Sequence, residues 1–325
     1  MHDIGEGTIR RIDWQELMPV VLLLRVFNIS LDLRTMLPAF CGGLLTVAVL
    51  TVCGESVSLG VHEIGSIKIP YMTVAADGRA GCRIAVWTAI YLVWILFGSM
   101  IVRTAAVRLT NNESESPGNQ FRFLRQRGLG FISSVVILII GILCCLLPVK
   151  IAVWLAAMPY VHFVVALFLP IPMLFAFFAA VLAVGLVFGW MLMFAAVCVE
   201  GSDGFDAISR MFSYLYQRPL HYVFYWFYCA VLGCIGCGIV WIFTSAVSFL
   251  TFDICKFPLD DGMGCFWIDI TLFIPLVYCL SWFWTSSTAI YLLLRRSVDA
   301  TPFNQVYRIK EAKTENLERL TPPVS

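Results

Sequence analysis

Four of the chain's 12 cysteines are spaced so that they could form two disulfide bonds. Cys53 and Cys82 flank one loop between apolar segments, and Cys255 and Cys265 flank another. On an oxidising side of a membrane, the pairs Cys53–Cys82 and Cys255–Cys265 would each close a hairpin at its mouth. The alternative is free thiols that serve as small apolar side chains. The sequence leaves both interpretations open.

A further cysteine motif, Cys234-x-x-Cys237, lies inside an apolar segment. Such motifs bind metals or exchange disulfides when they lie in loops or at helix starts. Here the neighbouring residues are small and include Gly233, Gly236 and Gly238. Small residues let membrane helices approach closely, so we interpret this motif as a packing surface.

Few ionisable residues lie within the apolar segments, where hydrocarbon makes a charge costly and usually functional. Asp269 is the intramembrane polar candidate, and the alternative is that it reaches the interface. A mix of acids, arginines and a histidine at 200–221 could hold a metal or a phosphate. Asp206 and Arg210 fit better as a helix start, with an acid first and a base one turn later. We predict no catalytic, cofactor or metal residues, because no GxSxG, P-loop or HExxH motif occurs.

The elements that would position these residues are membrane helices. Hydrophobic residues make up 60% of the 325 residues and charged residues 13%, whereas soluble domains carry about 25% charged residues. A net charge of +1 without a basic stripe gives no sign of a nucleic-acid partner. Six apolar runs are long enough to cross a hydrocarbon core about 30 Å thick. They are 35–53, 84–102, 130–148, 173–198, 222–246 and 267–294.

The distribution of lysine and arginine predicts the topology, because cytoplasmic loops are enriched in both. With six spans and an inner N-terminus, 17 of the 22 basic residues lie inside. A seventh span at 151–169 would leave 10 inside, so we expect that segment to be re-entrant or interfacial on the outer side. The sequence thus predicts a multi-pass membrane protein with both termini in the cytoplasm.

Two smaller elements flank the first span. Residues 12–30 are expected to form an interfacial amphipathic helix. The outer loop 54–83 alternates apolar and polar residues with a period of two, which predicts a β-hairpin.

An internal repeat appears when the sequence is shifted by 91 residues. Residues 97–129 then align with 188–220 without a gap and with nine identities. Each copy holds a Gln-Arg pair and then a residue that interrupts helices, as Gln126-Arg127-Gly128 and Gln217-Arg218-Pro219. We expect an elbow helix to end at each pair, with its arginine contacting lipid phosphates. The alternative is a chance similarity between two interfacial helices.

The fold predicted from these patterns is an all-α integral membrane protein. It has six transmembrane helices arranged as three hairpins with interfacial elbow helices. A single membrane domain would occupy 1–300, followed by a partly disordered cytoplasmic tail at 301–325. The three hairpin units are 1–102, 103–198 and 199–294.

Elbow helices that lead into long hairpins, such as Ala207-Ile208-Ser209-Arg210, resemble a known arrangement. It is similar to bacterial multi-pass families of unknown function, including the membrane domain of some glycerophosphodiester phosphodiesterases. The resemblance covers most of 35–300 and implies the architecture and a location in a bacterial inner membrane. It implies no enzymatic residues, because the catalytic domain of those phosphodiesterases does not occur here.

Three functional classes remain. We expect a non-enzymatic scaffold or accessory component that contacts membrane lipids, and protein partners or further copies of itself. The alternative is a transporter or channel for a small or lipidic solute. A polar path lined by Asp269, Thr285, Ser286 or Ser287 would favour transport, and a tightly packed interior would favour the scaffold. A membrane enzyme would need clustered acids or histidines facing one cavity.

Overall fold

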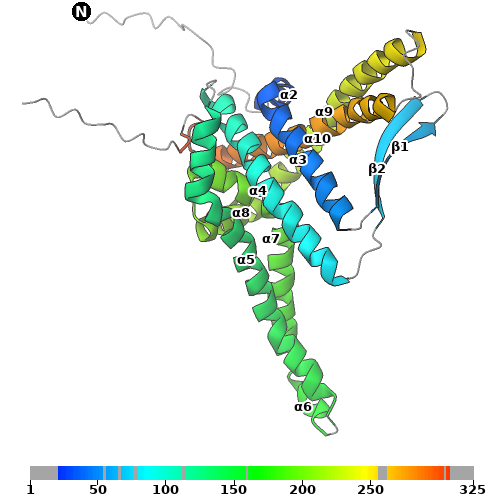
Figure 1. The fold of residues 1–325 in the computed structure, drawn as a ribbon. Helices are drawn as coiled ribbons and strands as arrows, with labels where there is room; N and C mark the ends of the chain where they lie inside the picture. The colour runs from blue at the N-terminus through cyan, green and yellow to red at the C-terminus, as the bar shows by residue number, and fades with distance from the viewer. Residues whose placement is uncertain are drawn as a thin grey trace, which may run out of the picture.

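The computed structural model describes most of the chain (Figure 1). It describes the backbone of residues 21–53, 56–64, 67–75, 80–111, 115–158, 160–254, 262–303 and 305–307. It describes the side chains of residues 21–53, 83–110, 115–158, 160–251, 267, 270–303 and 305–307. Within these residues, six helices are long and apolar enough to cross a membrane. The predicted all-α membrane fold is therefore confirmed.

The six long helices pair in chain order as three hairpins. The pairs are α3 (Leu33–Val52) with α4 (Ala80–Asn111), α5 (Pro117–Ala156) with α7 (Pro170–Glu200), and α9 (Pro219–Ser248) with α10 (Gly262–Asp299). Each predicted span lies within one of these helices, apart from Cys53, which caps α3. The hairpins project in different directions from a shared region (Figure 1). We call this region the convergent end; it comprises residues 101–109, 117–134, 191–200 and 284–299, with helices α2 and α8.

Residues 151–169 form the tip of the second hairpin. Helix α5 continues to Ala156, a turn follows, and the short helix α6 (His162–Leu167) precedes Pro170 at the start of α7. The side chains of α6 are all at least partly exposed. The segment therefore neither makes a seventh span nor folds back between the other helices, which agrees with an even number of crossings.

Two elbow helices lie at the convergent end, one before the first hairpin and one between the second and third hairpins. They are α2 (Val21–Ser30), the described part of the predicted helix 12–30, and α8 (Gly204–Gln217). Helix α8 buries one stripe of side chains at helical spacing against α5 and α7. Pro219 lacks a backbone N–H, so α8 ends before it and α9 begins there.

The prediction that an elbow helix ends at Gly128 was wrong. Helix α5 runs unbroken from Pro117 to Ala156 through that glycine. A glycine inside a helix costs only about 1 kcal/mol relative to alanine, and it keeps its N–H, which proline does not. Packing of this part of α5 against α7 and α8 outweighs so small a cost.

The β-hairpin predicted in the first loop is confirmed. Strands β1 (Ser56–Ile64) and β2 (Ile67–Ala75) pair antiparallel, with Ile64 opposite Ile67 at the turn. After the second elbow, α9 passes into a short π-helix, η1 (Phe249–Ile254).

Glycines lie where helices approach most closely. A Cβ atom at Gly98 of α4 would lie 2.9 Å from the ring of Trp284, and one at Gly43 of α3 would lie 2.8 Å from Phe273. A Cβ at Gly233 of α9 would lie 2.5 Å from the indole of Trp282. Small residues thus let α3, α4 and α9 pack against α10.

Burial is uneven among the helices. In the most apolar window of α10, 56% of residues are buried, against 11% in the corresponding windows of α5, α7 and α9. Helix α10 is therefore the central helix. The other three present long apolar faces, which need lipid or other membrane helices around them.

The contact of α8 with α5 generates a first prediction. A Cβ at Gly204 would lie 2.7 Å from the backbone nitrogen of Ser134, which has no room to move. We expect Gly204→Ala to destabilise the protein by about 1–3 kcal/mol through overpacking, although alanine favours helices. Thermal unfolding in detergent measures the effect.

The matched control is Gly238→Ala in α9, where a Cβ meets nothing within 4 Å. This change should leave stability the same or raise it by about 0.5–1 kcal/mol. Equal midpoints for the two variants would contradict the close contact of α8 with α5.

Candidate functional site

The C-terminal end of α7 is the focus of the polar contacts at the convergent end. A helix end leaves its last carbonyl oxygens without partners inside the helix. Gly201, in the left-handed region at φ +65°, donates its N–H to the Val197 oxygen at 2.9 Å. The N–H of Tyr307, from the C-terminal segment, reaches the Val199 oxygen at 2.8 Å.

The Cys198 oxygen is satisfied by a buried arginine from another hairpin. Arg103 of α4 is 1% exposed and donates from Nη1 to that oxygen at 2.9 Å. The same guanidinium binds Glu115 through two hydrogen bonds, of 2.8 and 3.2 Å. It also lies over the ring of Phe123 at 4.8 Å. Arginine can serve all of these partners because its donors form a rigid planar fork.

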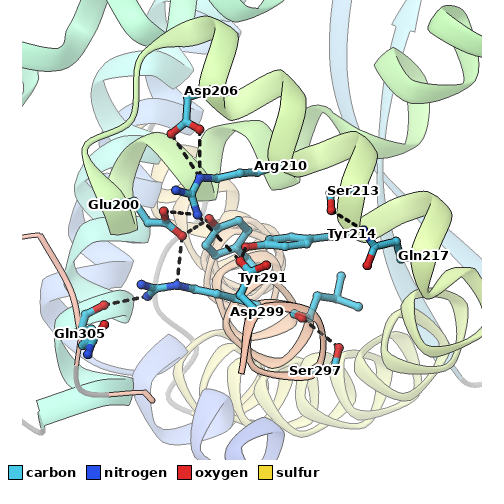
Figure 2. A network of polar contacts seen from close by, with 12 residues as sticks. Glu200, Asp206, Arg210, Ser213, Tyr214, Gln217, Tyr291, Ser297, Asp299 and Gln305 are labelled. Carbon is cyan, nitrogen blue, oxygen red and sulfur yellow. Dashed lines mark hydrogen bonds and ion pairs between the residues drawn. The ribbon is translucent and has the colours of Figure 1, made fainter. Parts of the chain in front are cut away.

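A second network surrounds Glu200, the last residue of α7 (Figure 2). Tyr291 of α10 donates its hydroxyl to the Glu200 Oε1 atom at 2.6 Å. Arg295 Nε lies 3.0 Å from the same oxygen, and Arg210 of α8 lies 2.5 Å from Oε2. The Glu200 network also includes Asp206, Tyr214 and Asp299.

The outer members of the Glu200 network extend it to α8 and to the C-terminal segment. Arg210 Nε bonds to Asp206 at 3.1 Å, as the predicted acid–base pair one turn apart. The hydroxyl of Tyr214 donates to Asp299 at the end of α10. Arg295 Nη1 donates to the backbone oxygen of Gln305 at 2.7 Å. Three helices, α7, α8 and α10, therefore meet at the Glu200 carboxylate, and the C-terminal segment joins the network through Arg295.

The protonation states of two α8 side chains follow from their surroundings. Burial, followed by the hydrogen bond to Asp299, raises the pKa of Tyr214 above its usual range. Burial alone would lower the pKa of Arg210, but its neighbours, first Glu200 and then Tyr291, Tyr214 and Asp206, together outweigh burial and raise the pKa. Tyr214 therefore stays a hydrogen-bond donor and Arg210 stays a cation at neutral pH.

This arrangement is suited to holding helices together rather than to exchanging protons with a substrate. Glu200, Asp206 and Asp299 each already pair with an arginine or a tyrosine. Arginines beside a helix C-terminus also offset the negative end of its dipole. The site can join α4, α7, α8 and α10 at one point.

Of the four predicted outer cysteines, Cys53 is the one whose side chain the structure describes. Cys53 is exposed where α3 ends. The side chains of Cys82, Cys255 and Cys265 lie outside the described residues. The pairs Cys53–Cys82 and Cys255–Cys265 therefore stay predictions.

The Gln-Arg pair of the first repeat copy lies on α5. Gln126 is exposed. Arg127 bonds to Asp203 at 3.0 Å and lies over the ring of Tyr307 at 5.5 Å. Arg127 therefore contacts the residue that precedes α8 and the C-terminal segment. Its contact with lipid phosphate stays a prediction.

The Gln-Arg pair of the second copy lies where α8 meets α9. Gln217 donates to the hydroxyl of Ser213 at 2.9 Å, one turn back along the helix. Arg218 is exposed between the two helices. A lipid-phosphate contact of Arg218 also stays a prediction.

The hydroxyls expected to line a transport path face the packed interior. Thr285 and Thr288 are fully buried and bond to backbone oxygens one turn earlier in α10, at 2.7 and 2.9 Å. Ser287 does the same at 2.6 Å. Asp269 lies on α10, with its side chain outside the described residues.

The cysteine motif of α9 lies in a helix contact, as predicted. A Cβ at Gly236 would collide with the hydroxyl of Tyr278. Cys237 Sγ lies 3.1 Å from Cys279 Sγ of α10, and both thiols are free. The motif packs α9 against α10.

Sequence reasoning missed the two residues at the centre of the site. Arg103 was assigned to the inner loop after the second span, yet α4 continues for two more turns. Its neighbours Ile101, Val102 and Ala105 are apolar, which is a sign that the helix continues past the predicted end of the span. Glu200 was grouped with the elbow acids, although it directly follows the long apolar run of α7.

A prediction follows for Glu200. Replacing Glu200 by Gln removes the charge that Arg210 and Arg295 share, while keeping the size of the side chain. Breaking one partner of a buried ion pair costs on the order of 3 kcal/mol, because Glu200 and Arg295 are each 10% exposed. We expect a lower unfolding midpoint in detergent.

Asp203→Asn is the control, because Asp203 pairs with Arg127 at the surface with its side chain 86% exposed. Its cost should be less than about 1 kcal/mol. If both variants unfold at the same temperature as the parent chain, the Glu200 network does not hold the helices together.

Comparisons of the chain with models of protein families, with curated proteins and with solved structures found no match. Six helices able to span a membrane identify the chain as a multi-pass membrane protein.

Proposed function

We propose that the protein is a non-enzymatic membrane scaffold or accessory component. The observation that carries the proposal is the contrast between its two ends. At the convergent end, the first hairpin is joined to the C-terminus of α7 by the hydrogen bond from Arg103 to the Cys198 oxygen, and the third hairpin by the ion pair between Arg295 and Glu200. Away from it, α5, α7 and α9 expose most of their apolar side chains. Rigidly anchored arms with open apolar faces suit the gathering of lipids and membrane partners.

The packed interior supports this role over solute transport. Transport of a polar solute requires hydrated side chains along a path across the membrane. The hydroxyls of Thr285, Ser287 and Thr288 are instead bonded to their own helix. The carboxylates of the convergent end are paired, so they offer no open binding group.

We further propose that this protein lies in a bacterial inner membrane with both termini in the cytoplasm. Three buried or half-buried arginines, Arg103, Arg210 and Arg295, gather at the convergent end. The positive-inside rule therefore supports a cytoplasmic convergent end. The three-hairpin arrangement also supports the proposed internal repeat and the resemblance to the membrane domain of some glycerophosphodiester phosphodiesterases.

A transporter of a lipidic solute is the second candidate. It is favoured by an apolar groove between the hairpins, lined by residues such as Trp87, Trp94 and Trp190. A groove of this kind could guide a hydrocarbon chain, whereas it could not solvate an ion.

Photo-crosslinking tests the scaffold role. A photoreactive amino acid at Ile239, which is 53% exposed on α9, should form one discrete protein adduct in cells. The adduct should disappear when Gly238 is changed to Leu, because that change fills the open face beside it. Gly118→Leu, also in open space, should leave the adduct unchanged.

The buried position Tyr278 provides the background level of crosslinking. Two results together would contradict the scaffold role and favour the lipid transporter. They are crosslinking of Ile239 to lipid alone and movement of a fluorescent lipid between the leaflets of proteoliposomes.

Reporter fusions test the orientation. A reporter active only in the cytoplasm should be active when it is fused before Met1 and when it is fused after Ser325. A reporter inserted in the β1–β2 hairpin should be active only outside. An exported C-terminal reporter with a cytoplasmic N-terminus would contradict six crossings.

A further inference from the structure

An apolar groove opens where the three hairpins diverge. Its volume is about 590 Å³, within the roughly 300–1,000 Å³ of ligand pockets in proteins. All three hairpins line it, and the lining presents apolar surface only. The lining residues are Trp87, Ile90, Tyr91, Trp94, Val135, Leu186, Trp190, Leu280, Phe283 and Trp284.

Aromatic side chains hold the wall of the groove in place. Trp284 stacks on Trp94 with ring centroids 5.7 Å apart, and Trp190 meets Trp284 edge-on at 5.7 Å. The hydroxyl of Tyr91 donates a hydrogen bond to the backbone oxygen of Phe131 in α5 at 2.9 Å. The wall is therefore rigid, and the one hydroxyl in it is already bonded within the protein.

Helix geometry sets the depth of the groove in the membrane. Arg83 and Arg103 are 20 residues apart on α4, or about 30 Å at 1.5 Å per residue. That distance equals the thickness of the hydrocarbon core. The groove residues on α4, from Trp87 to Trp94, begin about 6 Å from Arg83 and end about 16 Å from it. The groove therefore lies mainly in the half of the bilayer nearer Arg83 and ends near the midplane.

Arg83 is placed to meet a charged headgroup above the groove. Its side chain is exposed. Arg83, Trp87 and Tyr91 follow one another at intervals of four residues, so they lie on one face of α4. An arginine at the edge of the hydrocarbon reaches the phosphate level, while its neighbours one turn deeper contact hydrocarbon.

We propose that the groove is a binding site for one phospholipid. One hydrocarbon chain lies between the hairpins, and the phosphate contacts Arg83. The charge pattern supports this occupant, because an uncharged lining is capped by a cation at headgroup depth. A partner helix fits less well, because close helix contacts use small residues and this lining is mostly bulky and aromatic. The site does not depend on whether the protein is a scaffold or a transporter.

Two adjacent residues of α5 give a matched test of chain binding. Val135 lines the groove, whereas Val136 is 44% exposed outside it. The purified full chain is reconstituted with dioleoyl phosphatidylglycerol and then washed with increasing detergent. Native mass spectrometry counts the lipids that remain. We expect one lipid to persist on the parent chain and on Val136→Phe, and its retention to fall at least tenfold on Val135→Phe.

A second pair keeps the test valid if Val135→Phe does not fold, as judged by size-exclusion chromatography. Leu186→Phe in the groove should behave like Val135→Phe, and Val187→Phe, 62% exposed outside it, should behave like the parent chain. Equal lipid retention in groove and control variants would overturn the site, because it would mean that only non-specific surrounding lipid is bound.

The phosphate contact is tested separately. Arg83→Gln should lower the retention of phosphatidylglycerol several-fold, whereas Lys150→Gln, an exposed cation on α5, should not. Retention unaffected by Arg83→Gln would overturn the headgroup assignment. A protein found crosslinked to Trp94 in place of lipid would overturn the choice of occupant.

Discussion

The burial of a helix C-terminus that ends in a carboxylate is the constraint on which the structure depends. The end of α7 carries unpaired carbonyl oxygens, the negative pole of the helix dipole and the charge of Glu200. All three are costly away from water. They are offset by Arg103 from the first hairpin, Arg295 from the third, and Arg210 from the second elbow. No single hairpin can satisfy this end by itself, so its satisfaction requires all of them.

This one-ended attachment explains the shape of the molecule. Lipid is as apolar as a leucine side chain, so hydrophobic burial does not drive membrane helices together. Polar contacts and close packing must do so, and both concentrate at the convergent end and along α10. Away from that end the hairpins diverge (Figure 1). The opening between them is the aromatic groove, and the outer faces of α5, α7 and α9 stay apolar and exposed.

The contrast between Gly128 and Pro219 shows how far local sequence signals reach. Both follow a Gln-Arg pair, and both were expected to end a helix. Pro219 does so in any context, because it lacks the donor that a helix needs. Gly128 carries a penalty of about 1 kcal/mol, which contacts from distant residues easily exceed. The helix end at Pro219 could thus be predicted from the sequence, because the missing N–H acts in any context. The effect of Gly128 could not, because its small penalty is decided by contacts elsewhere in the fold.

The sequence by itself determined the six spans, their pairing as hairpins, the first-loop β-hairpin and the packing role of Gly233 and Gly236 in α9. These features depend on local composition: on runs of apolar residues, on alternation and on the size of neighbouring side chains. Only the tertiary structure decided that Arg103 is buried, that Glu200 is the meeting point of α7, α8 and α10, and that the hairpins leave an aromatic groove between them. Such contacts join residues about 100 positions apart. Their energies depend on distance and burial in three dimensions, which no pattern along the chain records.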